Sequence, residues 1–145
     1  MSKGDSGLFK GTSGTKAAQA VFVKKVLNSI KELIAKTHGS HKKSMIAGAY
    51  DSRTGKIASA FAGSIPTKIH PELLNRANSI GGLGTHGLTN KNIVGVCAEF
   101  HVVNELLLNG SKWSDIHLVT AIRPRTGLPM PFCANCLTMF KDIIN

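Results

Sequence analysis

Apolar residues recur every three or four positions between Lys16 and Lys36, and this is the clearest pattern in the first third of the chain. Lysines occupy many of the intervening positions, and the apolar set consists of Val23, Val26, Leu27, Ile30, Leu33 and Ile34. Spacing of this kind places the apolar side chains on one face of an α-helix. We therefore predict a long amphipathic helix over residues 16–36, with one face packed on a core.

Two short segments after this helix have the composition of a β-hairpin. Residues 45–50 and 56–63 consist mainly of small and apolar side chains, and a turn sequence that contains Gly55 separates them. Further along, residues 116–122 are β-branched and largely apolar, which is typical of a strand. Strands with apolar residues on both faces occupy the interior of a sheet, so we predict a central position for residues 116–122.

Start and stop signals predict three further helices. Pro71 suits the first turn of a helix over residues 70–78, because the N–H that proline lacks has no helical partner there. A second helix covers residues 97–108 and ends before Asn109 and Gly110. A third begins near Cys133 and extends to about residue 141.

A glycine-rich loop is predicted over residues 80–90. Its Gly82, Gly84 and Gly87 match the G-x-G-x-x-G spacing of dinucleotide-binding sites. No predicted strand precedes these glycines and no βαβ unit surrounds them, so we reject a dinucleotide site.

The length of 145 residues corresponds to one domain. Residues 1–15 are rich in Gly, Ser, Thr and Lys and are expected to form a flexible lead-in to a domain over residues 16–145. A hydrophobic fraction of 42% with 18% charged residues is typical of a globular protein and excludes a disordered one. No apolar run approaches the roughly 20 residues of a membrane span, so we expect no membrane association.

The chain has a formal net charge of +10, from 18 Lys and Arg against eight Asp and Glu. Such a surplus favours polyanionic partners through long-range attraction, although solubility alone would also account for it. The first residues lack the apolar stretch of a signal peptide. We therefore expect either a cytoplasmic protein or one piece of a larger exported protein.

Three cysteines give the chain its clearest chemical signal. Cys97 begins one predicted helix, and Cys133 and Cys136 lie in the first turn of another. Cysteines three positions apart on a helix face the same side, and unpaired N–H groups at a helix start favour thiolates. A strand between the two helices would bring their starts to one edge of the sheet. Three sulfur ligands for Zn²⁺ would leave a fourth tetrahedral position open for water, as in catalytic zinc sites.

Glu99 lies two residues after Cys97, within reach of that open position. A carboxylate there can accept a proton from water and pass it on to a substrate. The zinc-deaminase signature H-x-E…P-C-x-x-C is present, with Cys97 as first ligand and Phe132 inserted after Pro131. Two alternatives stay open: a closed structural site completed by His101, four residues after Cys97, and three buried cysteines without a metal.

Cys-Ala-Glu at 97–99 and Pro-Phe-Cys-Ala-Asn-Cys at 131–136 resemble the cytidine-deaminase-like superfamily, and the resemblance covers roughly residues 17–145. It implies an α/β fold, a three-layer α/β/α sandwich with a mixed sheet. It also implies a Zn²⁺ cofactor and hydrolytic deamination. Further strands usually follow the second zinc helix in that superfamily, whereas here only Ile143 and Ile144 are available to begin a fourth strand.

Residues 122–127 are similar to the bacterial polymorphic-toxin deaminases, particularly the YwqJ-related group. This resemblance implies the toxin domain of a larger exported protein that acts in a cytoplasm and has a cognate immunity protein as partner. With the positive charge, it leads us to expect single-stranded DNA or RNA as substrate, with cytosine favoured over adenine. Two alternatives are a free nucleoside or nucleotide deaminase, and a non-catalytic zinc-stabilised nucleic-acid-binding module.

Several residues outside the cysteine motif are candidates for substrate contact. A loop histidine or an aromatic ring could stack on a base, and arginines after a strand could hold phosphates. Ordinary loop, turn and core positions are the alternative for each of them, and Trp113 is expected in the core. The candidates are Ser64, His86, Arg123, Arg125 and Phe132.

Overall fold

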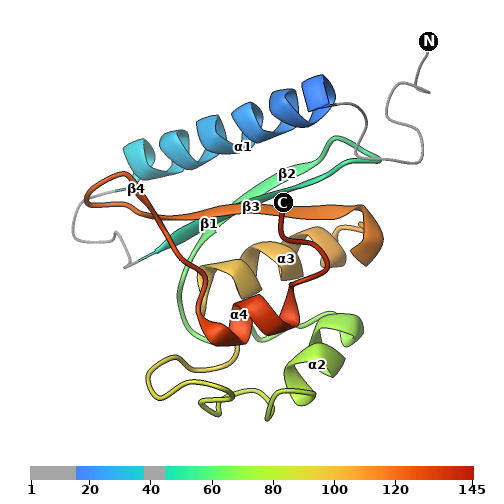
Figure 1. Ribbon diagram of the computed structural model, residues 1–145, viewed down its shortest axis with the longest axis vertical. Helices are drawn as coiled ribbons and strands as arrows, with labels where there is room; N and C mark the ends of the chain where they lie inside the picture. Colours follow the sequence, from blue (N-terminus) through green and yellow to red (C-terminus); the bar gives the residue numbers. More distant parts are fainter. Residues whose placement is uncertain (1–15, 38–44) are drawn as a thin grey trace.

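The computed structural model describes residues 16–37 and 45–145 and contains a four-stranded sheet between helices (Figure 1). The expected lead-in over residues 1–15 lies outside this part of the chain. The elements in chain order are α1 (Lys16–Lys36), β1 (Ile46–Asp51), β2 (Ile57–Phe61), α2 (Pro71–Asn78), α3 (Ala98–Leu108), a short 3-10 helix (Trp113–Asp115), β3 (Ile116–Arg123), β4 (Leu128–Met130) and α4 (Ala134–Met139). The predicted long helix, hairpin, short helix and central strand are therefore confirmed.

The sheet has the strand order β2-β1-β3-β4, and each pair of neighbouring strands is antiparallel. The expectation of a mixed sheet was wrong for these four strands. Within the described residues, the parallel pairing is a single bridge between Leu118 of β3 and Ile144 near the C-terminus. Ile144 thus lies where the start of a further strand was expected, but it does not extend into one.

Two elements differ from the sequence-based expectation. β4 was not predicted; it is only three residues long and contains Pro129, which lacks the N–H of a regular strand residue. Proline is tolerated here because β4 is the edge strand and pairs only with β3. The last helix, α4, ends at Met139 instead of near residue 141, and a turn follows it.

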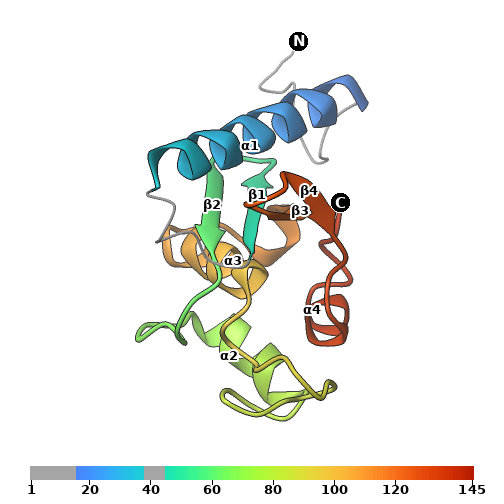
Figure 2. The ribbon, with the colours of Figure 1, turned by 90° about the vertical axis from the view of Figure 1, so that its left-hand side faces the viewer.

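Helix α1 covers one face of the sheet (Figures 1 and 2). Phe22, Val26 and Ile30 of the helix are buried against Ile46 and Tyr50 of β1. The contact is close at a glycine, since a Cβ atom at Gly48 would overlap Val26 Cγ1 and lie 2.9 Å from Ile30 Cδ1. Residue 48 must therefore lack a side chain if α1 is to pack on β1 at this distance.

Helix α3 covers the opposite face, and α2 and α4 lie beyond it (Figures 1 and 2). Ala47 and Ala49 of β1 belong to a second apolar cluster that includes Phe100 and Val103 of α3 and Cys136 of α4. Alternate residues of β1 therefore face different helices, as the two-residue period of a strand requires. The result is three layers, with α1, the sheet, and the other helices in succession.

Polar contacts join α2 to the C-terminal segment. Arg76 of α2 forms a bidentate pair with Asp142, at 3.0 and 3.1 Å, and lies 3.8 Å over the ring of Trp113. Trp113 donates its indole N–H to Asp142 at 3.0 Å and stacks on Phe140. Trp113 is buried, as expected of a core residue. Over residues 16–37 and 45–145 no helix is long and apolar enough to cross a membrane.

Gly48→Ala should lower the free energy of unfolding by about 1–3 kcal/mol, because the added methyl group overpacks a fully buried contact with Val26. Urea unfolding followed by circular dichroism would measure the change. Gly63→Ala is the matched control, since nothing lies within 4 Å of a Cβ at that position. Equal stability of the two variants would contradict the close approach of α1 to the sheet.

Candidate metal centre

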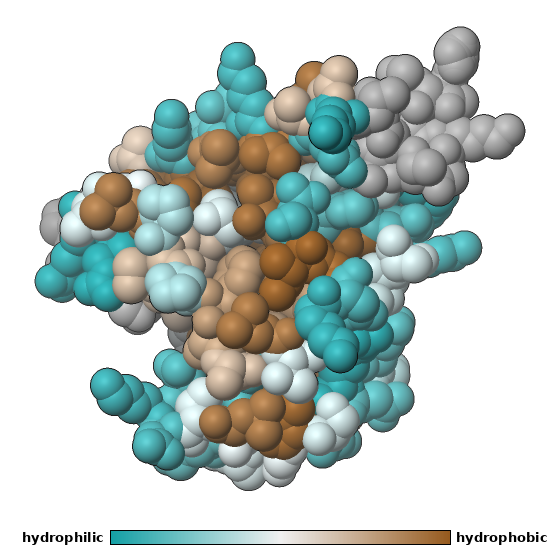
Figure 3. All heavy atoms as spheres, viewed as in Figure 1, coloured by the Kyte–Doolittle hydropathy of each residue, from teal (hydrophilic) through white to brown (hydrophobic). Residues whose placement is uncertain are grey.

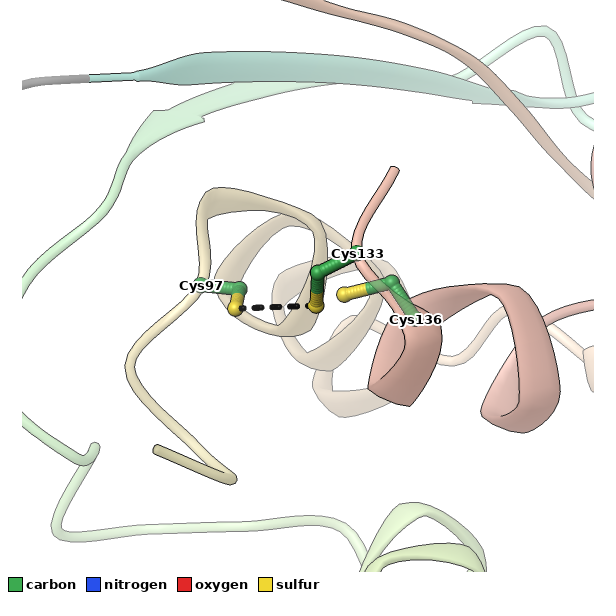
Figure 4. Close-up of side chains that lie close together, drawn as sticks. All are labelled: Cys97, Cys133 and Cys136. Atoms are coloured by element: carbon green, nitrogen blue, oxygen red, sulfur yellow. Dashed lines mark hydrogen bonds between the residues drawn. The ribbon is translucent and has the colours of Figure 1, made fainter. Parts of the chain in front are cut away.

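The three cysteines meet at the starts of two helices. Cys97 is the N-terminal cap of α3 and Cys133 is that of α4, and both have extended backbone angles. Neither side chain forms a capping hydrogen bond, so both are free to turn toward each other. Cys136 adds its side chain from the first turn of α4. Figure 4 shows the three side chains pointing toward one another.

The sulfur atoms have the spacing that a tetrahedral zinc site requires. Their Sγ atoms all lie within 4.8 Å of one another, and those of Cys97 and Cys133 are 4.0 Å apart (Figure 4). Zn–S bonds of about 2.3 Å in tetrahedral geometry would place two sulfurs about 3.8 Å apart. All three cysteines are free, and a distance of 4.0 Å is far longer than a disulfide bond. The donor set therefore fits a thiophilic metal ion such as Zn²⁺.

The thiols are electrostatically unequal. Hydrogen bonds from the Cys136 and Cys97 thiols, together with backbone N–H groups at the start of α4, hold the pKa of Cys133 below its ordinary value. Because they donate to Cys133, the pKa values of Cys97 and Cys136 are raised. The centre therefore stabilises one thiolate, and a bound cation would be needed to stabilise all three.

Glu99 lies beside this centre, in the first turn of α3. It is only 4% exposed, and burial, with a smaller contribution from the charge of Cys133, raises its pKa to about 7. A hydrogen bond with Cys136 shows that the carboxyl group is close to the sulfurs. Among the described residues, neither Lys nor Arg forms an ion pair with it. Glu99 is thus a buried carboxyl group whose nearest charged neighbours are sulfurs.

His101 does not belong to the cluster. Its Nε2 atom lies 3.2 Å from the carbonyl oxygen of Gly63, and the metal-capable group in the described residues contains only the three cysteines. The hydrogen bond holds His101 toward the end of β2. The closed site of three cysteines and His101 is therefore not formed in this structure.

Asn135, between the two cysteines of α4, was not singled out from the sequence. Its side chain is fully buried, and both ends of its amide group form hydrogen bonds to the loop at residues 80–90. The Oδ1 atom accepts from the N–H of Leu88 at 2.7 Å, and Nδ2 donates to the carbonyl of His86 at 3.1 Å. A polar residue inside C-A-N-C was the available signal, but a sequence does not show which residue such a side chain binds.

Hydrogen bonds to backbone atoms connect the segments that contain two of the predicted substrate-contact residues, His86 and Ser64, to the cysteine centre. The carbonyl of His86 is bonded to Asn135, and its own side chain is exposed. Ser64 is exposed and follows Gly63, whose N–H bonds to the carbonyl of Val96 immediately before Cys97. The structure therefore places both segments near the two helix starts.

Phe132 and the two arginines differ in their surroundings. Phe132 precedes Cys133 and is partly buried against the apolar cluster that includes Phe100 and Val103. Arg123 is the last residue of β3 and Arg125 lies in the turn that follows it; both are exposed, and this turn lies on the α1 side of the molecule in Figure 1. The cysteines lie on the opposite, α3 side. The arginines are therefore not part of the cysteine centre.

The centre is accessible from one side. Cys97 and Cys133 are partly exposed, whereas Cys136 is buried. In the view of Figure 3 the left margin of the surface is hollowed between the sheet layer and the layer that contains α2, at the level where α3 and α4 begin in Figure 1. A small molecule or an extended strand could approach the sulfurs from there.

No protein-family model matches the chain, and neither the curated proteins nor the solved structures contain a significant match. The geometry of the site therefore has to carry the functional argument.

Replacing any one of the three cysteines by serine should remove most of the bound metal. The purified protein should contain about one zinc ion per chain, because three converging thiols form a single site. Elemental analysis by mass spectrometry would measure the stoichiometry for Cys97→Ser, Cys133→Ser and Cys136→Ser. His101→Ala is the control and should keep its zinc; loss of zinc from this variant would support the four-ligand structural site.

Proposed function

We propose that this protein is a zinc-dependent hydrolytic deaminase of nucleobases in single-stranded nucleic acid, with cytosine preferred over adenine. One observation carries the proposal: a buried carboxyl group, Glu99, lies beside three converging cysteines that are accessible from one side. Structural zinc sites have four protein ligands and need no neighbouring acid. The enzyme would be a hydrolase that acts on amidine C–N bonds.

Cys97, Cys133 and Cys136 would hold the metal. A zinc ion bound there would supply the Lewis acidity that makes water nucleophilic at neutral pH. Glu99 would accept one proton of the attacking water and deliver it to the ring nitrogen. It would then move the remaining hydroxyl proton to the amino group, which leaves as ammonia. The amino-bearing carbon, C4 of cytosine or C6 of adenine, would lose NH₃ and gain a carbonyl oxygen. The burial of Glu99 supports this role, because it raises the pKa of the carboxyl group to about 7, where the group can both accept and release a proton near neutral pH.

The distribution of charge favours a polymeric substrate over a free nucleoside. Several acidic groups are internally satisfied: Asp115 and Asp142 pair with arginines, and Asp51 is buried and accepts the Ser111 hydroxyl. By contrast, α1 exposes basic side chains with a single glutamate among them, and the β3–β4 turn adds Arg123 and Arg125. The exposed lysines of α1 are Lys16, Lys24, Lys25, Lys31 and Lys36.

This basic surface and the cysteine centre lie on opposite sides of the sheet (Figure 1). A molecule that contacts both must be longer than one nucleotide. An unpaired strand is favoured because extracting a base from a duplex costs a few kcal/mol. The resemblance to polymorphic-toxin deaminases supports a further proposal, that this chain is the toxin domain of a larger exported bacterial protein, acts in a cytoplasm and is neutralised by an immunity protein.

Glu99→Gln should retain zinc and cooperative unfolding, while deaminase activity falls by several orders of magnitude, because the proton carrier is lost but no ligand is. Single-turnover assays on cytosine-containing oligonucleotides, combined with zinc analysis, would test this. Glu105→Gln, on the same helix but away from the cysteines, is the matched control. An active, zinc-loaded Glu99→Gln protein would contradict the mechanism.

Binding to single-stranded oligonucleotides should weaken steeply as salt rises, because phosphate contacts release counterions. Arg123→Ala combined with Arg125→Ala should weaken binding to all sequences and reduce the salt slope by about 1–2. Fluorescence anisotropy across a salt series would measure this. Lys56→Ala with Lys112→Ala removes the same charge at the other end of the sheet and is the control.

Mass spectrometry of treated DNA, RNA and nucleosides would identify the substrate directly, because deamination changes the mass of the base. Efficient turnover of free cytidine or adenosine without deamination of either polymer would defeat the nucleic-acid proposal in favour of a nucleoside deaminase.

A further inference from the structure

We propose that Asn135 is a positioning residue that links the metal centre to the loop at residues 81–95, so that zinc binding fixes the loop residues that select the substrate. The substrate part of this inference rests on the proposed deaminase function. The link between metal and loop does not, and it can be tested with zinc alone.

The link is a single buried side chain. Asn135 lies between Cys133 and Cys136 in the first turn of α4, and its side chain has no exposed surface. Its amide oxygen accepts the Leu88 N–H and its amide nitrogen donates to the His86 carbonyl. A buried amide with both ends engaged is costly to displace, because each lost bond would leave a polar group unpaired. The loop should therefore follow the first turn of α4.

Hydrogen bonds within the loop would pass a shift of α4 on to the rest of the loop. Thr85 accepts the N–H of Val94 at 2.8 Å through its carbonyl, and its hydroxyl donates to the Gly82 carbonyl at 2.7 Å. The N–H of Gly84 bonds in turn to Val94 at 3.0 Å. These bonds join the two arms of the loop over about ten residues. The loop is thus a cross-linked unit whose tip is held by Asn135.

Gly87 is shaped for the contact with Asn135. Its φ of +59° is a conformation that side chains rarely adopt, and a Cβ atom there would lie 2.5 Å from Asn135 Oδ1 and 2.9 Å from Val94 Cγ2. Glycine at this position therefore permits both the turn and the close approach. A larger residue would have to push the loop away from α4.

The tip presents a surface suited to a flat, uncharged ring. The side chain of His86 is exposed, and Leu88 is 54% exposed although its backbone is tied to buried Asn135. Leu137, two residues after Asn135, is 50% exposed. An imidazole and two leucines, exposed on segments that flank the cysteines, would offer stacking and apolar contact to the face of a heteroaromatic base. Asn135 would determine where this surface lies relative to the sulfurs.

Hydrogen exchange with and without zinc tests the coupling. Zinc draws Cys133 and Cys136 into one coordination geometry, so it should slow exchange in the peptide covering residues 81–95 by about tenfold or more in the wild-type protein. Asn135→Ala should still bind one zinc ion but lose this protection. Equal zinc protection of the loop in the two proteins, or none in the zinc-loaded wild type, would overturn the inference.

A second variant leaves α4 unchanged, in case Asn135→Ala does not fold. Gly87→Ala should uncouple the loop in the same way, because its methyl group would displace Asn135 Oδ1. Gly84→Ala is the matched control: it also has a positive φ, of +81°, but its nearest neighbour is Ile65 Cδ1 at 3.9 Å. Gly84→Ala should retain the protection by zinc. Loss of that protection in both variants would attribute the effect to backbone strain and overturn the role of Asn135.

Kinetics then address substrate selection. Asn135→Ala and Gly87→Ala should raise KM for an oligonucleotide by about tenfold while kcat falls much less, since the metal ligands and Glu99 are unchanged. A loss confined to kcat would contradict a role in substrate selection. If zinc protects the loop in the wild type but no nucleobase is deaminated, the proposed function fails while the coupling stands.

Discussion

Three sulfur atoms and one carboxyl group share a largely buried volume, and this crowding of acidic groups is the constraint on which the site depends. Without a cation only one thiolate is stabilised, by hydrogen bonds from the other two thiols and from the start of α4. Glu99, 4% exposed, has no cationic partner among the described residues to compensate its own charge. A divalent metal ion held by the three cysteines would compensate both charges.

The sheet makes the convergence of these groups possible. Cys97 and Cys133 are 36 positions apart, and β3 and β4 lie between them. Because β3 is central, between β1 and β4, the segments on either side of it are held in register by antiparallel pairing. At the far end of the sheet, buried Asp51 accepts hydrogen bonds from Ser111 and from the turn after β1, which ties the hairpin to the start of β3. The cysteines at the starts of α3 and α4 can therefore move little relative to one another.

Rigid and adaptable parts of the site have different origins. The sulfurs and Glu99 are presented by α3, which packs on the sheet, and by α4, which shares an apolar cluster with α3. The exposed side chains of His86 and Leu88 lie on a loop, where they can vary without disturbing the core. Asn135 joins the two parts, since its backbone belongs to α4 and its side chain is bonded to the loop. The basic α1 surface is separate from both and lies on the other side of the sheet.

The sequence by itself determined the local elements and the chemical groups. Helix α1, the β1–β2 hairpin and the central strand are encoded by the period of neighbouring residues, and Cys97, Glu99, Cys133 and Cys136 by motif spacing. Tertiary structure decided the rest. The bond of His101 to Gly63 placed it outside the cysteine cluster, the edge position of β4 made Pro129 acceptable in a strand, and the position of the β3–β4 turn set Arg125 apart from the cysteines. The partners of Asn135 lie 47 and 49 positions away. Such pairings depend on how segments that are distant in the sequence pack together. The hydrophobic periodicity of a sequence reports only the local secondary structure.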